Sequence, residues 1–326
     1  MTRYIIKRIL MTMLIVFVVM FIVFVLLYWV SGYMMRVLPI EGDGDALDAM
    51  FAFFNASNNV FTRYLRYIFN VVFHFDFGTA WGGWPLVYSL MERTRNTVIM
   101  LGTGTILTLI AGIPIGIIAA VKKDRLGDRI VNVLTTLLSS IPIFAIAFVI
   151  LVFFVLHLRI LPANFPYVTP SVFIMPAITI ALNGIATVAR MTRASMIEVL
   201  EQPYILALRA RGLKESQVLC RHALKNALIP VISAFGGFVS QLFLGIFVVE
   251  SFFTIHGLSS LILQSVELIL RELGLIRFIH EMLGAVLIMT VILAVVNLAS
   301  DIAYTIVNPK IRLRYSSKSR IKRGAK

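Results

Sequence analysis

The sequence predicts an all-α polytopic membrane protein with six spanning helices. Of its 326 residues, 59% are hydrophobic and only 14% are charged, and the mean hydropathy of +0.92 lies outside the range of soluble domains. A spanning helix needs about 20 mostly apolar residues, and the chain carries long continuous apolar runs rather than the alternating segments of a membrane barrel. The runs that qualify are residues 9–30, 97–121, 130–156, 171–188, 227–249 and 282–307.

The first run, residues 9–30, has Thr12 as its only clearly polar side chain. It is longer than a signal-peptide core and no A-x-A cleavage site follows it, so we expect a retained span. In the second run, Gly112 and Gly116 stand four residues apart, a spacing that predicts close helix packing. Pro142 falls inside the third run.

The distribution of Lys and Arg predicts that both termini are cytoplasmic. If the N-terminus is inside, 22 of the 30 Lys and Arg residues fall in inner segments, as the positive-inside rule requires. This bias accounts for the net charge of +14 without a nucleic-acid partner, since no stripe of interleaved aromatic residues accompanies the charge. The inner segments are residues 1–8, 122–129, 190–225 and 310–326.

The predicted organisation follows from these spans. Aromatic residues of the first outer segment, among them Tyr64, Tyr67, Trp81 and Trp84, suit a bilayer interface or an outer partner. The second outer segment has the pattern of an interfacial or pore-capping helix. Four parts follow one another along the chain: a cytoplasmic start with the first span (1–31), an extracytoplasmic segment (32–95), a core with spans two to six (96–307) and a basic cytoplasmic tail (308–326). The core includes a cytoplasmic loop (190–228) and a second extracytoplasmic segment (251–281).

Three polar side chains at or near membrane depth are candidates for a gate. Asn183, Glu250 and Asp301 lie in or beside apolar runs, where polar and ionisable groups are costly and suggest function. For Asp301 the alternative is a position at the interface, beside Lys310 or Arg312 of the basic tail.

No catalytic motif is recognisable in the chain. It lacks a G-x-x-x-x-G-K-[ST] phosphate loop, a G-x-S-x-G elbow and a Cys/His cluster with metal-ligand spacing. Cys220 is the only cysteine and cannot form an internal disulfide. We therefore expect a non-enzymatic chain that binds neither a cofactor nor a metal.

The most informative segment is a polar island between the fourth and fifth apolar runs. Residues 193–226 are too long for a turn and too charged for lipid, and they carry helical patterning on both sides of Gly212. Cations gather near the end of the first helix, where they interact well with its dipole, and Gly212 stands where a C-terminal cap glycine would. Such an element suggests a docking site for a soluble partner. On periodicity alone, an amphipathic helix lying on lipid fits equally well.

The island resembles the cytoplasmic EAA loop of bacterial ABC-importer permeases, and in particular the first permease subunit of the dipeptide/oligopeptide and nickel family. The likeness rests on RMTRASMIEVLEQPYILALRARGLKES with RHALKNALIPVI, on VVESFFTIHGLSSL and on GIPIGIIAAVKKDRLGDR. It extends to SIPIFAIAFVILVFF, VNLASDIAYTIVNPKIR and the N-terminal YIIKRIL. The Glu-Ala-Ala of the loop's name is replaced here by Leu206-Ala207-Leu208.

The resemblance implies a type I ABC importer permease fold in the bacterial inner membrane. This chain would form half of the translocation pore with a second homologous permease, two ATPase subunits would bind ATP and Mg²⁺, and an extracytoplasmic binding protein would deliver peptides. The alternatives are nickel or another small solute carried by the same architecture, and a membrane scaffold that moves no solute. The residues expected to couple to the ATPase are Glu201, Ala207, Leu208, Arg209, Arg211, Gly212 and Leu213.

Overall fold

The structure is almost entirely helical. Within the part of the chain that it describes, the only extended pairing is an isolated bridge between Thr79 and Pro85. The computed structural model describes residues 2–37, 59–79, 84–161, 170–271 and 278–307.

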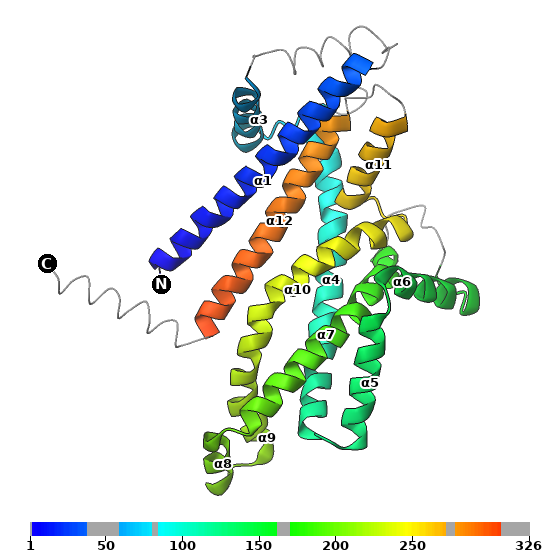
Figure 1. Ribbon diagram of the computed structural model, residues 1–326. Helices are drawn as coiled ribbons and strands as arrows, with labels where there is room; N and C mark the ends of the chain where they lie inside the picture. The colour runs from blue at the N-terminus through cyan, green and yellow to red at the C-terminus, as the bar shows by residue number, and fades with distance from the viewer. Residues whose placement is uncertain (1, 38–58, 80–83, 162–169, 272–277, 308–326) are drawn as a thin grey trace, which may run out of the picture. The chain divides into compact units, whose positions relative to one another are not determined.

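Five helical stretches among these residues are long and apolar enough to cross a membrane, or six if one bent pair is counted as a single span. They coincide with the runs predicted from the sequence and extend several of them (Figure 1). The helices that supply the five stretches are α1 (Thr2–Val37), α4 (Leu86–Val121), α7 (Ile174–Leu200) with the preceding 3-10 turn Pro170–Phe173, α10 (Leu224–Phe252) with the turns that precede it, and α12 (Phe278–Val307).

The third predicted span is not one straight helix. It consists of α5 (Leu126–Ser140) and α6 (Ile143–Leu151), the latter continued by a π-helical turn over Val152–His157, and the two parts are bent by 100°. Pro142 causes the break, because a residue before proline is pushed out of the helical region. Ile141 accordingly has φ −84° and ψ 124°, and Pro142 is the N-cap residue that precedes α6.

The described residues divide into two compact units. The first contains residues 2–8, 99–161, 170–253 and 295–307, and the second contains residues 9–37, 59–79, 84–98, 254–271 and 278–294. In the first unit, α7 packs against α5, α6 and α10. The predicted close packing at Gly116 is confirmed: a Cβ there would lie 2.6 Å from the Ala189 carbonyl oxygen and from Thr192 Cβ.

The second unit contains α3 (Val60–His74) and α11 (Leu258–Arg271). The first turns of α11 are tied to α4, where the Asn96 side chain donates to the His256 carbonyl at 2.9 Å and Thr97 Oγ accepts from the Leu258 amide at 2.9 Å. The predicted helix of the second outer segment is therefore confirmed as α11, and its interfacial or pore-capping role remains a prediction.

The aromatic residues of the first outer segment do not behave as a group. Tyr64 and Tyr67 are buried against α1, so they face neither a bilayer nor a partner, whereas Trp84 is largely exposed. Trp81, the acidic stretch 41–45 and the basic tail 308–326 lie outside the described residues.

Candidate functional site

The polar island begins as a direct continuation of α7, which stays helical through Leu200. The helix then breaks at Glu201 and Gln202. Gln202 is extended (φ −71°, ψ 142°), and α8 (Pro203–Ala210) starts with a proline at its first position. Proline suits this position because its fixed φ is helical and the amide hydrogen that it lacks would have no partner there. The first helix of the island is thus two helices with a sharp joint.

Gly212 ends α8 as the sequence predicts. Its φ is +77°, a left-handed conformation that glycine adopts without steric cost. The Gly212 amide donates to the Arg209 carbonyl at 2.9 Å and the Leu213 amide to the Leu208 carbonyl at 3.4 Å. These two bonds are those of a Schellman cap, which satisfies carbonyls at the end of the helix and turns the chain away.

The second predicted helix of the island is confirmed and runs without a gap into the fifth span. Its parts are α9 (Glu215–Gln217), a π-helical turn over Val218–Ala223 (η3) and α10, together one helical stretch from Glu215 to Phe252. Because α7 enters the island and α10 leaves it, α8 is joined through short connections to two candidate spans.

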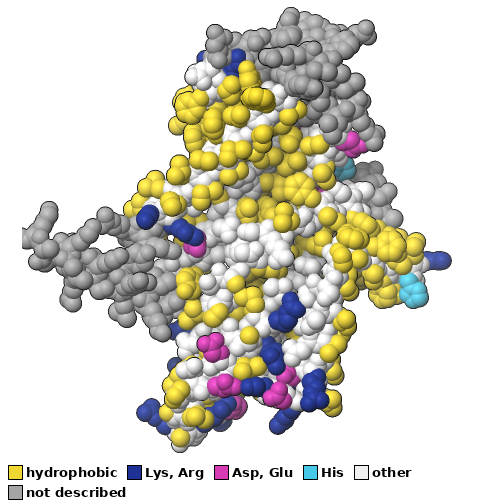
Figure 2. All heavy atoms as spheres, viewed as in Figure 1, with side chains coloured by type: hydrophobic (Ala, Val, Ile, Leu, Met, Phe, Trp, Pro, Cys, Tyr) yellow, Lys and Arg dark blue, Asp and Glu magenta, His cyan; other side chains and the backbone are white. Residues whose placement is uncertain are grey.

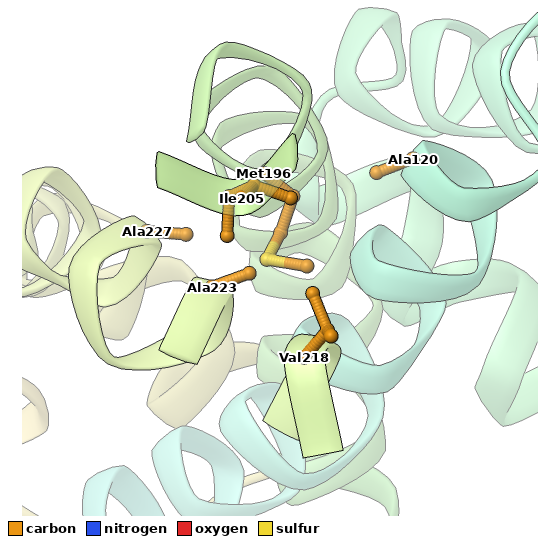
Figure 3. Close-up of a cluster of buried hydrophobic side chains, with 6 residues drawn as sticks. All are labelled: Ala120, Met196, Ile205, Val218, Ala223 and Ala227. Carbon is orange, nitrogen blue, oxygen red and sulfur yellow. The ribbon is translucent and has the colours of Figure 1, made fainter. Parts of the chain in front are cut away.

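A buried hydrophobic cluster, here called the docking core, holds α8 in place. Ile205 is fully buried and is the side chain by which α8 enters this core. Figure 3 shows Ile205, Met196 and Val218 converging from three different elements. A further tie runs from the Asn226 side-chain amide to the Tyr204 hydroxyl at 2.8 Å. The docking core comprises Ala120, Met196, Ile205, Val218, Ala223 and Ala227.

The outward side of α8 is exposed and mixed in character. Leu206 keeps 61% of its surface exposed. It lies at a charged end of the molecule, where Lys, Arg, Asp and Glu side chains gather around α8 (Figure 2). Of the predicted coupling residues, Leu208 and Leu213 are half-buried and pack against the docking core. The others, Glu201, Ala207, Arg209, Arg211 and Gly212, are exposed.

Two of the predicted coupling charges have partners inside the chain. Lys123 Nζ lies 2.7 Å from Glu201 Oε1, and Arg209 forms a two-pronged pair with Glu215 at 2.7 and 3.1 Å. These hydrogen bonds raise the pKa of Lys123 and of Arg209 above their usual values, so both side chains stay charged at neutral pH. An ion pair from Glu201 or Arg209 to another protein would therefore compete with one that already exists.

Sequence reasoning missed a largely buried ion pair in the first unit. Asp128, at the start of α5, accepts from Arg193 Nε at 2.5 Å and from Arg193 Nη2 at 2.7 Å. It also accepts from the Asp124 amide at 2.9 Å and from the Asn132 side chain at 3.1 Å. The available signal was an acid four residues before an asparagine, in a turn that carries four basic residues and one other acid, Asp124. The pair fastens the α4–α5 turn to α7 two turns before the joint with α8.

The three predicted polar residues of the apolar runs have different surroundings. Asp301 forms an ion pair with Arg8 of α1, while Lys310 and Arg312, its expected neighbours, lie outside the described residues. Glu250 is fully buried in the last turn of α10, and Asn183 is half-buried on α7. A gating role for any of the three remains a prediction.

Ile205→Ala is expected to loosen α8 without unfolding the spans. Truncating a fully buried isoleucine costs about 2–5 kcal/mol, and 2 kcal/mol corresponds to roughly a 30-fold larger open population. Limited trypsinolysis after Arg209 and Arg211 should speed up by about that factor when reclosing is fast relative to cleavage. Leu206→Ala on the exposed side is the matched control. Equal cleavage rates in the two variants would show that the docking core does not hold α8.

Comparison with known proteins assigns the chain to a family. The profile described as "Binding-protein-dependent transport system inner membrane component" matches residues 112–313. The chain belongs to this family. The matched region begins within α4 and extends past the end of α12, and so contains the whole polar island, residues 193–226.

Individual relatives extend the likeness to nearly the full chain. The dipeptide transport system permease protein DppB of Bacillus subtilis is 30% identical over 96% of this chain and 99% of its own length. The oligopeptide transport system permease protein AppB of the same organism is 30% identical over 95% and 99%. The glutathione transport system permease protein GsiC of Escherichia coli K12 is 29% identical over 96% and 100%.

Family membership confirms the predicted all-α polytopic permease. The chain is a multi-pass membrane component of an ABC importer. Members of its family work with other transporter components and are generally not catalytic themselves. No group of three or more His, Cys, Asp or Glu able to hold a metal occurs within the described ranges.

Proposed function

We propose that this chain is the permease subunit of an ATP-driven importer of di- and oligopeptides in the bacterial inner membrane. It forms half of the translocation pore, with a second homologous permease as the other half. Two ABC ATPase subunits bind ATP and Mg²⁺, and an extracytoplasmic binding protein delivers the substrate. The relatives named above are dipeptide, oligopeptide and glutathione permeases, which favours peptides over nickel and transport over a non-transporting scaffold.

The observation that carries the coupling role is the geometry of α8. A short exposed helix, held by Ile205 in the docking core and closed by the Gly212 cap, stands between α7 and α10. Since both neighbours are candidate spans, a displacement of α8 by the ATPase would tilt two helices of the pore. Rigid displacement of packed helices is a recurrent way to transmit such a change.

Within this proposal, residues 190–228 form the coupling loop and both termini are cytoplasmic. Leu206, Ala207 and Arg211 supply the exposed contact surface for the ATPase, while Leu208 and Leu213 position α8 from inside. Glu201 and Arg209 can exchange their internal partners for charges on the ATPase. Because such exposed pairs contribute only about 0–1 kcal/mol each, the apolar contacts should carry more of the affinity.

Uptake by proteoliposomes that contain the complete transporter tests the substrate. With ATP on the motor side and the binding protein on the other, labelled di- and oligopeptides should accumulate, and uptake should stop when a non-hydrolysable ATP analogue replaces ATP. Labelled Ni²⁺ is the parallel substrate. ATP-dependent accumulation of nickel without peptide would contradict the peptide assignment and establish the alternative. Absence of any ATP-dependent uptake would support the alternative that the chain is a membrane scaffold that moves no solute.

A further inference from the structure

Helix α3 presents three distinct stripes along its length. It begins at Asn59, whose side chain caps the Phe61 amide at 3.0 Å, and ends at His74. One stripe is buried and contains Tyr64, Tyr67 and Val71. A second carries Thr62, Arg66, Asn70 and His74 four residues apart, with the exposed Phe73 between the first two on the same face. The third is hydrophobic yet exposed by 42–57% per residue, and consists of Phe61, Leu65, Phe69 and Val72.

α3 lies beside α1 (Figure 1), and side chains of its buried stripe contact that helix. The Tyr64 hydroxyl donates to the Phe17 carbonyl at 2.6 Å, and the Tyr64 ring lies 5.0 Å from that of Phe17, 5.2 Å from Phe21 and 5.6 Å from Phe24. The pairs with Phe17 and Phe21 are edge-to-face, a geometry that adds to the energy of simple burial. α3 is thus firmly attached to one face of α1.

The contact fixes where α3 lies along a membrane-spanning helix. Phe17, Phe21 and Phe24 all belong to the apolar stretch Ile5–Val30 of α1, and α1 continues to Val37. α3 therefore lies beside the apolar part of α1 and not beyond its end. Acyl chains surround such a stretch wherever protein does not, and α1 itself exposes Ile22 and Leu26 at the same level.

We propose that α3 is an interfacial lipid-binding helix, whose stripe of Phe61, Leu65, Phe69 and Val72 inserts among the acyl chains beside α1. The neighbouring polar stripe fits the same arrangement, because Arg66 can extend its long side chain to phosphate head groups while its methylenes stay in the apolar layer. A helix with an apolar face beside a face that carries polar side chains and one arginine has the chemistry expected for a helix lying in the interface plane. α3 would then tie the outer half of α1 to the bilayer surface, a property separate from transport.

Site-directed spin labelling tests the insertion directly. The chain has one cysteine, so Cys220→Ser provides a background in which Phe69→Cys and Leu65→Cys each carry a single nitroxide. Arg66→Cys on the polar stripe of the same helix is the matched control. The full chain, purified with its partner subunits, is reconstituted in nanodiscs of phosphatidylcholine and phosphatidylglycerol. Collision rates with O₂, which concentrates in lipid, and with a water-soluble nickel chelate are then compared.

We expect the labels at positions 69 and 65 to collide several-fold more with O₂ than with the chelate, and the label at position 66 to show the reverse preference. Collision of the position 69 label with the chelate at the rate found at position 66 would place the stripe in water and overturn the proposal. Protection of positions 69 and 65 from both reagents would show that a protein covers the stripe, which also overturns it. Two labelled positions guard against local misfolding of either variant.

Discussion

Gly212→Pro is expected to abolish transport while the assembled ATPase continues to hydrolyse ATP. Proline holds φ near −65° and has no amide hydrogen, whereas Gly212 has φ +77° and donates to the Arg209 carbonyl. The substitution therefore removes the cap, because proline can neither adopt this φ nor donate this hydrogen bond. α8 would lose its fixed direction and no longer transmit the motion of the ATPase. The measurement is the number of peptides transported per ATP hydrolysed in proteoliposomes.

Gly212→Asn is the matched control for this experiment, because asparagine tolerates the left-handed region better than other side chains. A Cβ at position 212 meets nothing within 4 Å in the chain itself, so asparagine should keep the cap and most of the transport. If a bulky side chain at position 212 reduces transport, the cause would be either the strained backbone φ or a clash with the ATPase, and not a clash within this chain. Wild-type transport by Gly212→Pro would contradict the coupling role of α8.

The second large effect is expected from breaking the Asp128–Arg193 pair. The Asp128 side chain is only 2% exposed and that of Arg193 is 22% exposed, so Asp128→Ala leaves a mostly buried guanidinium without its carboxylate. Breaking a buried pair from one side costs about 3–5 kcal/mol, and the residual exposure of Arg193 favours the lower end. The apparent Tm of the purified complex should fall, and transport should fall with it.

A double-mutant cycle separates the pair from general destabilisation. Asp128→Ala with Arg193→Ala should cost less than the sum of the two single variants, because neither charge is then left unpaired. Arg209→Ala with Glu215→Ala is the matched control, since those side chains are 40% and 53% exposed and such a pair is worth only about 0–1 kcal/mol. Additive losses in the Asp128–Arg193 cycle would show that the pair does not act as a unit.

The spans and the α8 cap were predictable because their causes are local. About 20 consecutive apolar residues suffice to identify a spanning helix, and a glycine that follows a helical pattern with cations in its last turn indicates a C-terminal cap. The Gly112 and Gly116 spacing predicted helix packing for the same reason. In each case the pattern is read from residues close together in the sequence.

The features that sequence reasoning missed depend on distant residues or on geometry within a short segment. Asp128 and Arg193 are 65 positions apart, and the residues around either one do not predict that the other is its partner. Pro142 was recognised, but the 100° bend depends on where the helix resumes after the proline. Tyrosine is a residue type suited to a bilayer interface, but Tyr64 and Tyr67 are buried because they lie on the face of α3 that packs against α1.

We propose that this chain works as the permease of a peptide importer with an ATPase docked on α8. Affinity purification of the tagged chain from its native host in mild detergent, followed by mass spectrometry of the proteins that co-purify, tests it most directly. A second polytopic permease and one or two P-loop ATPases should be recovered with the wild-type chain, and the ATPases should be depleted by Leu206→Asp on the exposed side of α8. Recovery of the chain alone, or with unrelated proteins, would contradict the proposal.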